Sequence, residues 1–222
     1  MKHLFSLLFF LCSFSYAQNV VRYYNLNVKS GHAESFKAIF DEFQSGRKWK
    51  SGGIFLQSVQ FRNDITHRVV LWGDPENWGT VEPRKEYEWT AYRSLRNRHI
   101  ENKAPDSAMG TVLAFTSGDI EANPRGKVWD IKVENPSKFK AAWDKIISSS
   151  KSILGDRRIG LVQYDAGGNG ATHAIVLYGK SINDLVLTER KIKNQKSFKD
   201  YLENRGEVEY IATYMINTLS RY

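Results

Sequence analysis

Hydrophobic residues recur along the chain with two different spacings, that of a β-strand and that of an amphipathic α-helix. Residues 20–28 and 127–133 read as strands, with Leu26/Val28 and Ile131/Val133 on one face of each. Each segment is followed by apolar residues at the i, i+3, i+4, i+7 spacing of an amphipathic helix: Phe36, Ile39, Phe40 and Phe43 in the first case, and Phe139, Ala142, Trp143 and Ile146 in the second. The pattern therefore predicts a strand followed by a helix, twice.

The two occurrences belong to an internal repeat. Residues 66–73 (THRVVLWG) reappear about 106 positions later as residues 172–179 (THAIVLYG), and Gln57 falls opposite Gln163 at the same offset. The helix segments match as well, since Phe36-Lys37-Ala38 corresponds to Phe139-Lys140-Ala141. We interpret the chain as two copies of one unit.

Each copy continues in the same order. A hairpin is predicted at residues 54–61 with 67–73, and again at 159–164 with 173–179; second helices at 84–102 and 189–204; and closing strands at 111–115 and 208–216. The order βαββαβ is that of the ferredoxin-like unit, so we predict an α+β fold of two tandem repeats. Their expected bounds are residues 18–116 and 127–222, joined by the polar linker 117–126 (SGDIEANPRG).

The duplicated unit resembles the dimeric α/β-barrel superfamily, which includes antibiotic-biosynthesis monooxygenases, NIPSNAP-like proteins and stress-responsive A/B barrels. The resemblance rests on element order, unit length and duplication. It implies that the two sheets pack face to face as an intramolecular version of the superfamily's dimer. Fold does not determine function, so the activity stays open.

The N-terminus has the organisation of a secretory signal peptide. Lys2 and His3 precede an apolar stretch, and Ser15-Tyr16-Ala17 supplies small residues at the cleavage positions. We expect cleavage near Ala17 and a secreted or periplasmic location. Cleavage would remove Cys12, the only cysteine, which excludes disulfides and thiol catalysis in the mature chain.

The chain is basic, with a formal net charge of +8. Lys and Arg concentrate on the two predicted second helices, with a smaller cluster at Arg47-Lys48-Trp49-Lys50. A basic face on an exported protein can contact an anionic polymer or a membrane surface, although it also serves solubility. Specific nucleic-acid binding is not predicted, because no recognition module is present.

Three histidines are candidate catalytic residues. His67 and His173 begin the third strand of their repeats, and imidazole titrates near neutral pH. The alternative is a structural role, in which each Thr-His pair closes a hairpin. No metal site is predicted, because only Asp64 or Asp165 lies nearby in each repeat.

Strand polarity predicts where a ligand would lie. Polar residues occupy the face opposite the core face of the first strands, and buried polar groups need partners or a ligand. The candidate ligand-binding residues are Tyr23, Asn25, Gln57, Trp72, Asp130, Gln163 and Tyr178. They could instead satisfy one another across the interface between the repeats.

The resemblance also implies one specific alternative. Haem-degrading monooxygenases of the superfamily combine an Asn on the first strand, a Trp on the third and a haem-ligating His on the second helix. Asn25, Trp72 and His99 are the corresponding residues here. No cofactor is predicted otherwise, and haem stays the alternative.

Three functions therefore remain. The first is an exported protein that binds a small organic ligand, with catalysis unproven. The second is a monooxygenase-type or haem-binding enzyme of the same superfamily. The third is a structural or surface protein that contacts an anionic polymer or membrane. The fused pair could be monomeric or assemble further.

Overall fold

The computed structural model describes residues 18–101 and 107–222. The first half comprises β1 (Val20–Leu26), α1 (Ala33–Gln44), β2 (Gly53–Gln60), β3 (His67–Gly73), the 3-10 turn η1 (Pro75–Asn77), α2 (Glu86–Asn97) and β4 (Ala108–Phe115). The second half comprises β5 (Arg125–Val133), α3 (Pro136–Ser149), α4 (Lys151–Leu154), β6 (Ile159–Ala166), β7 (His173–Gly179), α5 (Ile182–Lys193), α6 (Lys196–Asn204) and β8 (Val208–Arg221). The signal peptide expected at residues 1–17 lies outside the described residues.

The strands close into one barrel in the order β1-β3-β2-β8-β5-β7-β6-β4. Each half contributes four neighbouring strands, and the halves join at two antiparallel seams, β2 with β8 and β4 with β6. The two tandem βαββαβ repeats predicted from the sequence are confirmed. Closure leaves no unpaired edge among the eight strands of the described chain, so the polar backbone of each has a neighbour on both sides.

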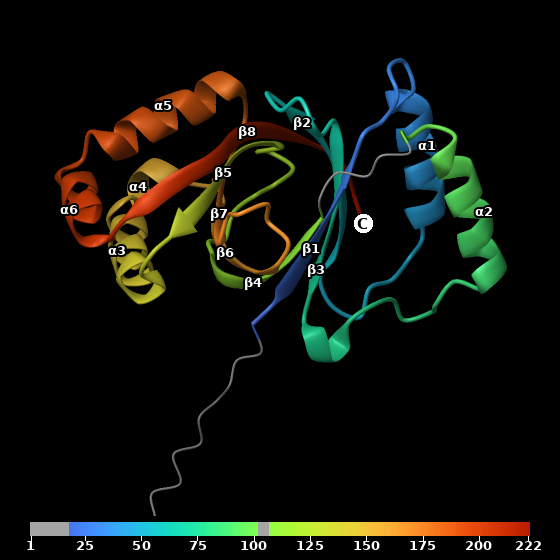
Figure 1. Ribbon diagram of the computed structural model, residues 1–222, viewed down its shortest axis with the longest axis horizontal. Helices are drawn as coiled ribbons and strands as arrows, with labels where there is room; N and C mark the ends of the chain where they lie inside the picture. The colour runs from blue at the N-terminus through green and yellow to red at the C-terminus, as the bar shows by residue number, and fades with distance from the viewer. Residues whose placement is uncertain (1–17, 102–106) are drawn as a thin grey trace, which may run out of the picture.

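The helices cover the outside of the barrel on opposite sides. Helices α1 and α2 pack on the first half, and α3 to α6 pack on the second (Figure 1). Strand alternation sends one set of side chains outward to the helices and the other into the barrel. On β3, for example, Val69 and Leu71 pack outward near α1, while Val70 and Trp72 point into the barrel.

Local sequence explains where the helices begin. The Asn135 side chain accepts a hydrogen bond of 3.0 Å from the backbone N–H of Lys138, and Pro136 occupies the first turn of α3. Ser181 caps α5 in the same way through the N–H of Asp184. Within the described ranges, no helix is long and apolar enough to cross a lipid bilayer.

Two predicted boundaries are wrong. The single second helix expected at 189–204 is two helices, because the chain turns at Asn194 and Gln195 between α5 and α6 and the first of them begins at Ile182. Strand β5 begins at Arg125, inside the expected linker, because Arg125 and Gly126 pair with both β7 and β8. Tertiary pairing overrides the polar, glycine-containing local sequence there.

Candidate functional site

A cleft of about 720 Å³ lies between the outer face of the first half's strands and its helices. Strands β1 and β3 form its floor with Leu26, Val69 and Leu71, and α1 and α2 form its walls. The rim comes from the loops before β2 and after η1. We call this space the outer cleft.

Aromatic rings and arginines line one wall of the outer cleft. The ring of Tyr92 stacks on that of Phe43 with centroids 4.1 Å apart, and the Trp89 ring meets Phe43 edge-on at 4.7 Å. The Arg47 guanidinium lies 5.4 Å from the Trp89 ring and 5.2 Å from the Trp49 ring. Such surroundings suit flat apolar ligands, and the cations add affinity for negative charge.

The arginines of this wall are incompletely satisfied. Arg84 bonds Glu88 at 2.9 Å and donates to the Phe43 carbonyl at 3.1 Å, and Arg47 donates to Gln44 at 2.7 Å. Within the described chain, the buried Nε atoms of Arg47 and Arg84 and Nε1 of Trp49 have no hydrogen-bond partner. Burial, together with the neighbouring Arg84, lowers the pKa of Arg47. An anionic ligand would relieve both conditions.

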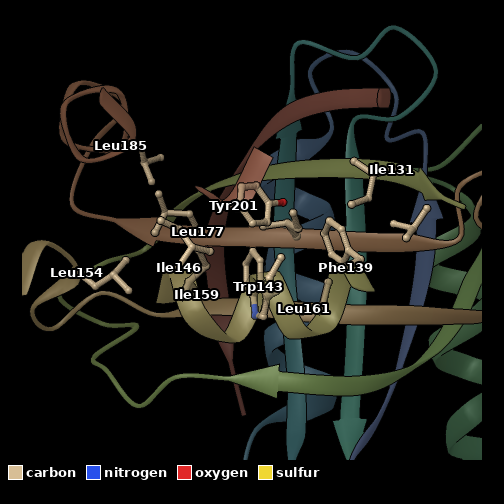
Figure 2. Close-up of a cluster of buried hydrophobic side chains, with 13 residues drawn as sticks. Ile131, Phe139, Trp143, Ile146, Leu154, Ile159, Leu161, Leu177, Leu185 and Tyr201 are labelled. Carbon is tan, nitrogen blue, oxygen red and sulfur yellow. The ribbon is translucent and has the colours of Figure 1, made fainter. Parts of the chain in front are cut away.

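The equivalent space in the second half is largely filled. There the gap between strands and helices is about 300 Å³. Figure 2 shows this core, where Phe139 and Trp143 on α3 lie among Ile159, Leu161 and Leu177 of the strands. Helix α6 adds Tyr201, whose ring lies 6.2 Å from that of Phe139. The two copies share a fold but differ in how much space they enclose.

The two repeated histidines occupy equivalent structural positions away from this space. Nδ1 of His67 lies 3.0 Å from Oγ1 of Thr66, and Nδ1 of His173 lies 2.9 Å from Oγ1 of Thr172. Each threonine hydroxyl also accepts a backbone N–H, from Val28 or Val133. Neither ring lines the outer cleft, the gap between strands and helices of the second half or the polar space at one end of the barrel. The geometry favours the structural interpretation of the Thr-His pairs.

Burial of these two rings has a consequence for stability against pH. Burial lowers the pKa of both His67 and His173. The unfolded chain takes up protons near pH 6.5 while the folded chain resists them, so stability falls as pH drops through about 6.5. We expect the His67→Gln/His173→Gln variant to lose less stability than the wild type between pH 7.5 and 5.5. Urea unfolding at both values measures this, and an equal loss in both proteins would contradict it.

The three residues matched to a haem site do not converge. Trp72 points into the barrel and Asn25 lies where β1 separates the barrel interior from the outer cleft. His99 follows α2 and pairs with His32 instead, with their Nδ1 atoms 3.0 Å apart. No histidine lines the outer cleft within residues 18–101 and 107–222. The arrangement does not fit haem ligated by His99.

Most of the other predicted ligand-binding residues lie inside the barrel. Tyr23, Asn25 and Asp130 line a polar cavity of about 320 Å³ at one end, which we call the barrel cavity. Gln57 is buried deeper and donates to the hydroxyl of Tyr178 at 3.3 Å. Strand polarity therefore located a real interior cavity.

Gln163 is the exception, and the predicted equivalence of Gln57 and Gln163 is wrong. Gln57 pairs with Arg68 on β3, whereas Gln163 pairs with His173 on β7 and is exposed on the outside. Ala174 is the counterpart of Arg68 in the second copy, and the residue that pairs with Ala174 is Val162. The structural counterpart of Gln57 is therefore Val162. A one-residue difference in hairpin register moved the side chain to the other face of the strand.

Comparisons with known proteins bear on the whole fold. No family model matches the chain, and no curated protein matches it in sequence. Among solved structures, a protein provisionally named a monooxygenase from Fusobacterium nucleatum subsp. nucleatum has a TM-score of 0.60 and 17% identity over 93% of this chain and 94% of its own. A similarly named protein from Lactobacillus acidophilus also reaches 0.60, with 9% identity over 92% and 94%. The fold is that of the dimeric α/β-barrel superfamily.

A third structure extends the range of functions found on this dimeric α/β barrel. A haem-binding protein from Thermus thermophilus has a TM-score of 0.55 and 10% identity over 92% of each chain. At these identities the similarity establishes the fold alone.

Sequence reasoning missed the wall of the outer cleft. Arg47 and Trp49 were noted only as members of a basic cluster, and Arg84 and Trp89 only as part of a basic helix. The available signal was tryptophan interleaved with arginine, at residues 47–50 before β2 and at residues 84–89 around the start of α2. Such residues need no conserved register to meet, so the periodicity of the repeat does not reveal them.

Proposed function

We propose that the outer cleft binds a flat, largely apolar organic acid. The observation that carries the proposal is the wall itself, where stacked aromatic rings adjoin two arginines with unpartnered buried Nε atoms. The rings provide a face for the apolar body of a ligand, and the arginines provide charge-assisted hydrogen bonds for its acid group. Among neighbours of the same fold, two are provisionally named monooxygenases and one is a haem-binding protein, which supports a small-molecule role.

The residues of the cleft suit binding better than acid–base catalysis. Its described lining contains no Asp, Glu, His or Cys. Burial raises the pKa of Tyr92 to about 12, so the phenol stays protonated and is a hydrogen-bond donor at neutral pH. Oxygenation of a bound substrate, which the monooxygenase-named neighbours favour, is the second candidate. It would require a substrate whose own chemistry supports reaction with oxygen, because the cleft supplies no general base.

Protoporphyrin IX and haem are suitable probes, because both are flat dicarboxylic acids and only haem carries iron. We expect both to bind with affinities within about threefold, because the described lining offers the iron no histidine. The Arg47→Gln/Arg84→Gln variant should bind both about 10- to 100-fold more weakly, from the loss of two charge-assisted contacts. Fluorescence quenching measures the affinities.

Two controls make this experiment decisive. Arg93→Gln removes an exposed arginine from α2 outside the cleft and should leave the affinities unchanged. His99→Ala should also have no effect. Loss of haem binding in His99→Ala, with porphyrin binding retained, would instead restore the haem-ligand interpretation. Unchanged binding in the double arginine variant would contradict the proposed cleft.

A further inference from the structure

The barrel cavity is a second, separate space with a different chemistry. It lies at the end of the barrel bounded by the β2–β3 and β6–β7 hairpins, and its volume of about 320 Å³ is room for about ten water-sized groups. Both halves build it: Tyr23 and Arg68 come from the first, and Asp130, Tyr164 and Tyr214 from the second. Arg68 and Asp130 line this cavity and not the outer cleft.

Arg68 is a buried cation whose direct partners are neutral. Only 5% of the surface of Arg68 is exposed to solvent. Nε donates to Oε1 of Gln57 at 2.7 Å, and Nη1 donates to the Tyr214 hydroxyl at 3.1 Å. These bonds use two of the five N–H donors of the guanidinium. Across the described ranges, no carboxylate lies within 4 Å of it.

The acids of the cavity are engaged by a different arginine. Asp130 is 7% exposed, accepts a hydrogen bond of 2.8 Å from the Tyr164 hydroxyl and lies 3.6 Å from Arg62. Arg62 also binds Asp64 at the mouth, through Nε at 2.9 Å. Burial raises the pKa of Asp130, so its negative charge is held less firmly than that of a surface carboxylate. Asp130 still interacts electrostatically with Arg68, but the ion pair that it forms is with Arg62.

Burying a charge that forms no ion pair is energetically unfavourable, so such groups normally meet a counter-ion or a ligand. Burial raises the pKa of Tyr214 to about 12 and also raises that of Tyr23, so both phenols stay protonated at neutral pH. A carboxylate matches the planar fork of a guanidinium. We propose that the barrel cavity binds a small organic monocarboxylate through Arg68, with the tyrosine hydroxyls as additional donors.

The site can be tested with acetate, butyrate and benzoate, each titrated calorimetrically into the full-length protein against its own amide. We expect the carboxylates to bind and the amides to bind at least tenfold more weakly. Arg68→Lys keeps the charge but loses the fork, and should weaken carboxylate binding at least tenfold. Asp130→Asn removes the nearby negative charge at constant volume and should tighten binding severalfold.

Controls separate this site from the outer cleft and from inorganic anions. Arg93→Gln, on the surface of α2, should leave the affinities unchanged. If Arg84→Gln weakens carboxylate binding and Arg68→Lys does not, the anions bind in the outer cleft and the proposal is overturned. Nitrate binding as tightly as the carboxylates would overturn the organic class of ligand. If Arg68→Lys does not fold, Asp130→Asn decides, and unchanged affinity in that variant overturns the proposal.

Discussion

Replacing Phe139 by Ala is expected to lower the free energy of unfolding by about 3–5 kcal/mol, the usual cost of removing a fully buried aromatic ring. The side chain has no exposed surface and contacts the rings of Trp143, His173 and Tyr201. Figure 2 shows it between Trp143 and Ile131 in the second half's core, and in so densely packed a region the space left by the ring would fill only if α3 or the strands moved. Urea unfolding followed by circular dichroism measures the loss.

The matched control is Phe61→Ala. Phe61 is 74% exposed in the β2–β3 hairpin, so its removal should change stability by no more than about 0.5 kcal/mol. Similar losses in the two variants would show that the second half is not the densely packed unit described here. Because Phe139 lies on the opposite side of the barrel from the outer cleft, the folded fraction of Phe139→Ala should bind porphyrin normally.

Replacing Gly52 by Ala is expected to destabilise the protein by about 2–5 kcal/mol, from two additive causes. Gly52 has a φ of +65°, a left-handed conformation that costs an L-residue roughly 1–2 kcal/mol. A Cβ there would also lie 1.8 Å from the backbone carbonyl oxygen of Trp72, so β2 and β3 would have to separate. Overpacking of this kind adds about 1–3 kcal/mol. Thermal and urea unfolding give the combined value.

Gly46→Ala separates these causes. Gly46 has a φ of +71° but no atom within 4 Å of an added Cβ, so only the conformational cost of about 1–2 kcal/mol applies. Equal losses at the two glycines would mean that the strands adjust freely and that the close approach at Gly52 does not matter.

The fold could be predicted because each strand and helix pattern occurs twice in the sequence, so that one copy supports the assignment made in the other. The matched segments 66–73 and 172–179 became β3 and β7 with identical bounds in their units. Strand β8 was predicted to end near residue 216 but continues to Arg221, because it pairs with β2 of the other half. Seams between units are long-range contacts, and local patterns carry little information about them.

The candidate sites were predicted unevenly for a similar reason. Alternation along β1 and β5 is enough to place Tyr23, Asn25 and Asp130 inside the barrel. Arg68 could not be predicted in the same way, because its match in the other copy is Ala174 and the repeat therefore gives no sign of a site there. The outer cleft exists because α1 and α2 leave space above the strands of the first half. The periodicity of hydrophobic residues predicts the helices but not the volume that remains beneath them. The signal peptide and the exported location stay predictions.

The seams β2·β8 and β4·β6 join halves of a single polypeptide, and this has a consequence for how the protein responds to concentration. An interface between separate subunits weakens on dilution, whereas this one holds its halves at a fixed effective concentration set by the linking chain. One substitution also alters one half only, so the roomy first copy and the filled second copy can change independently. Ligand affinity should therefore be the same at nanomolar and micromolar protein.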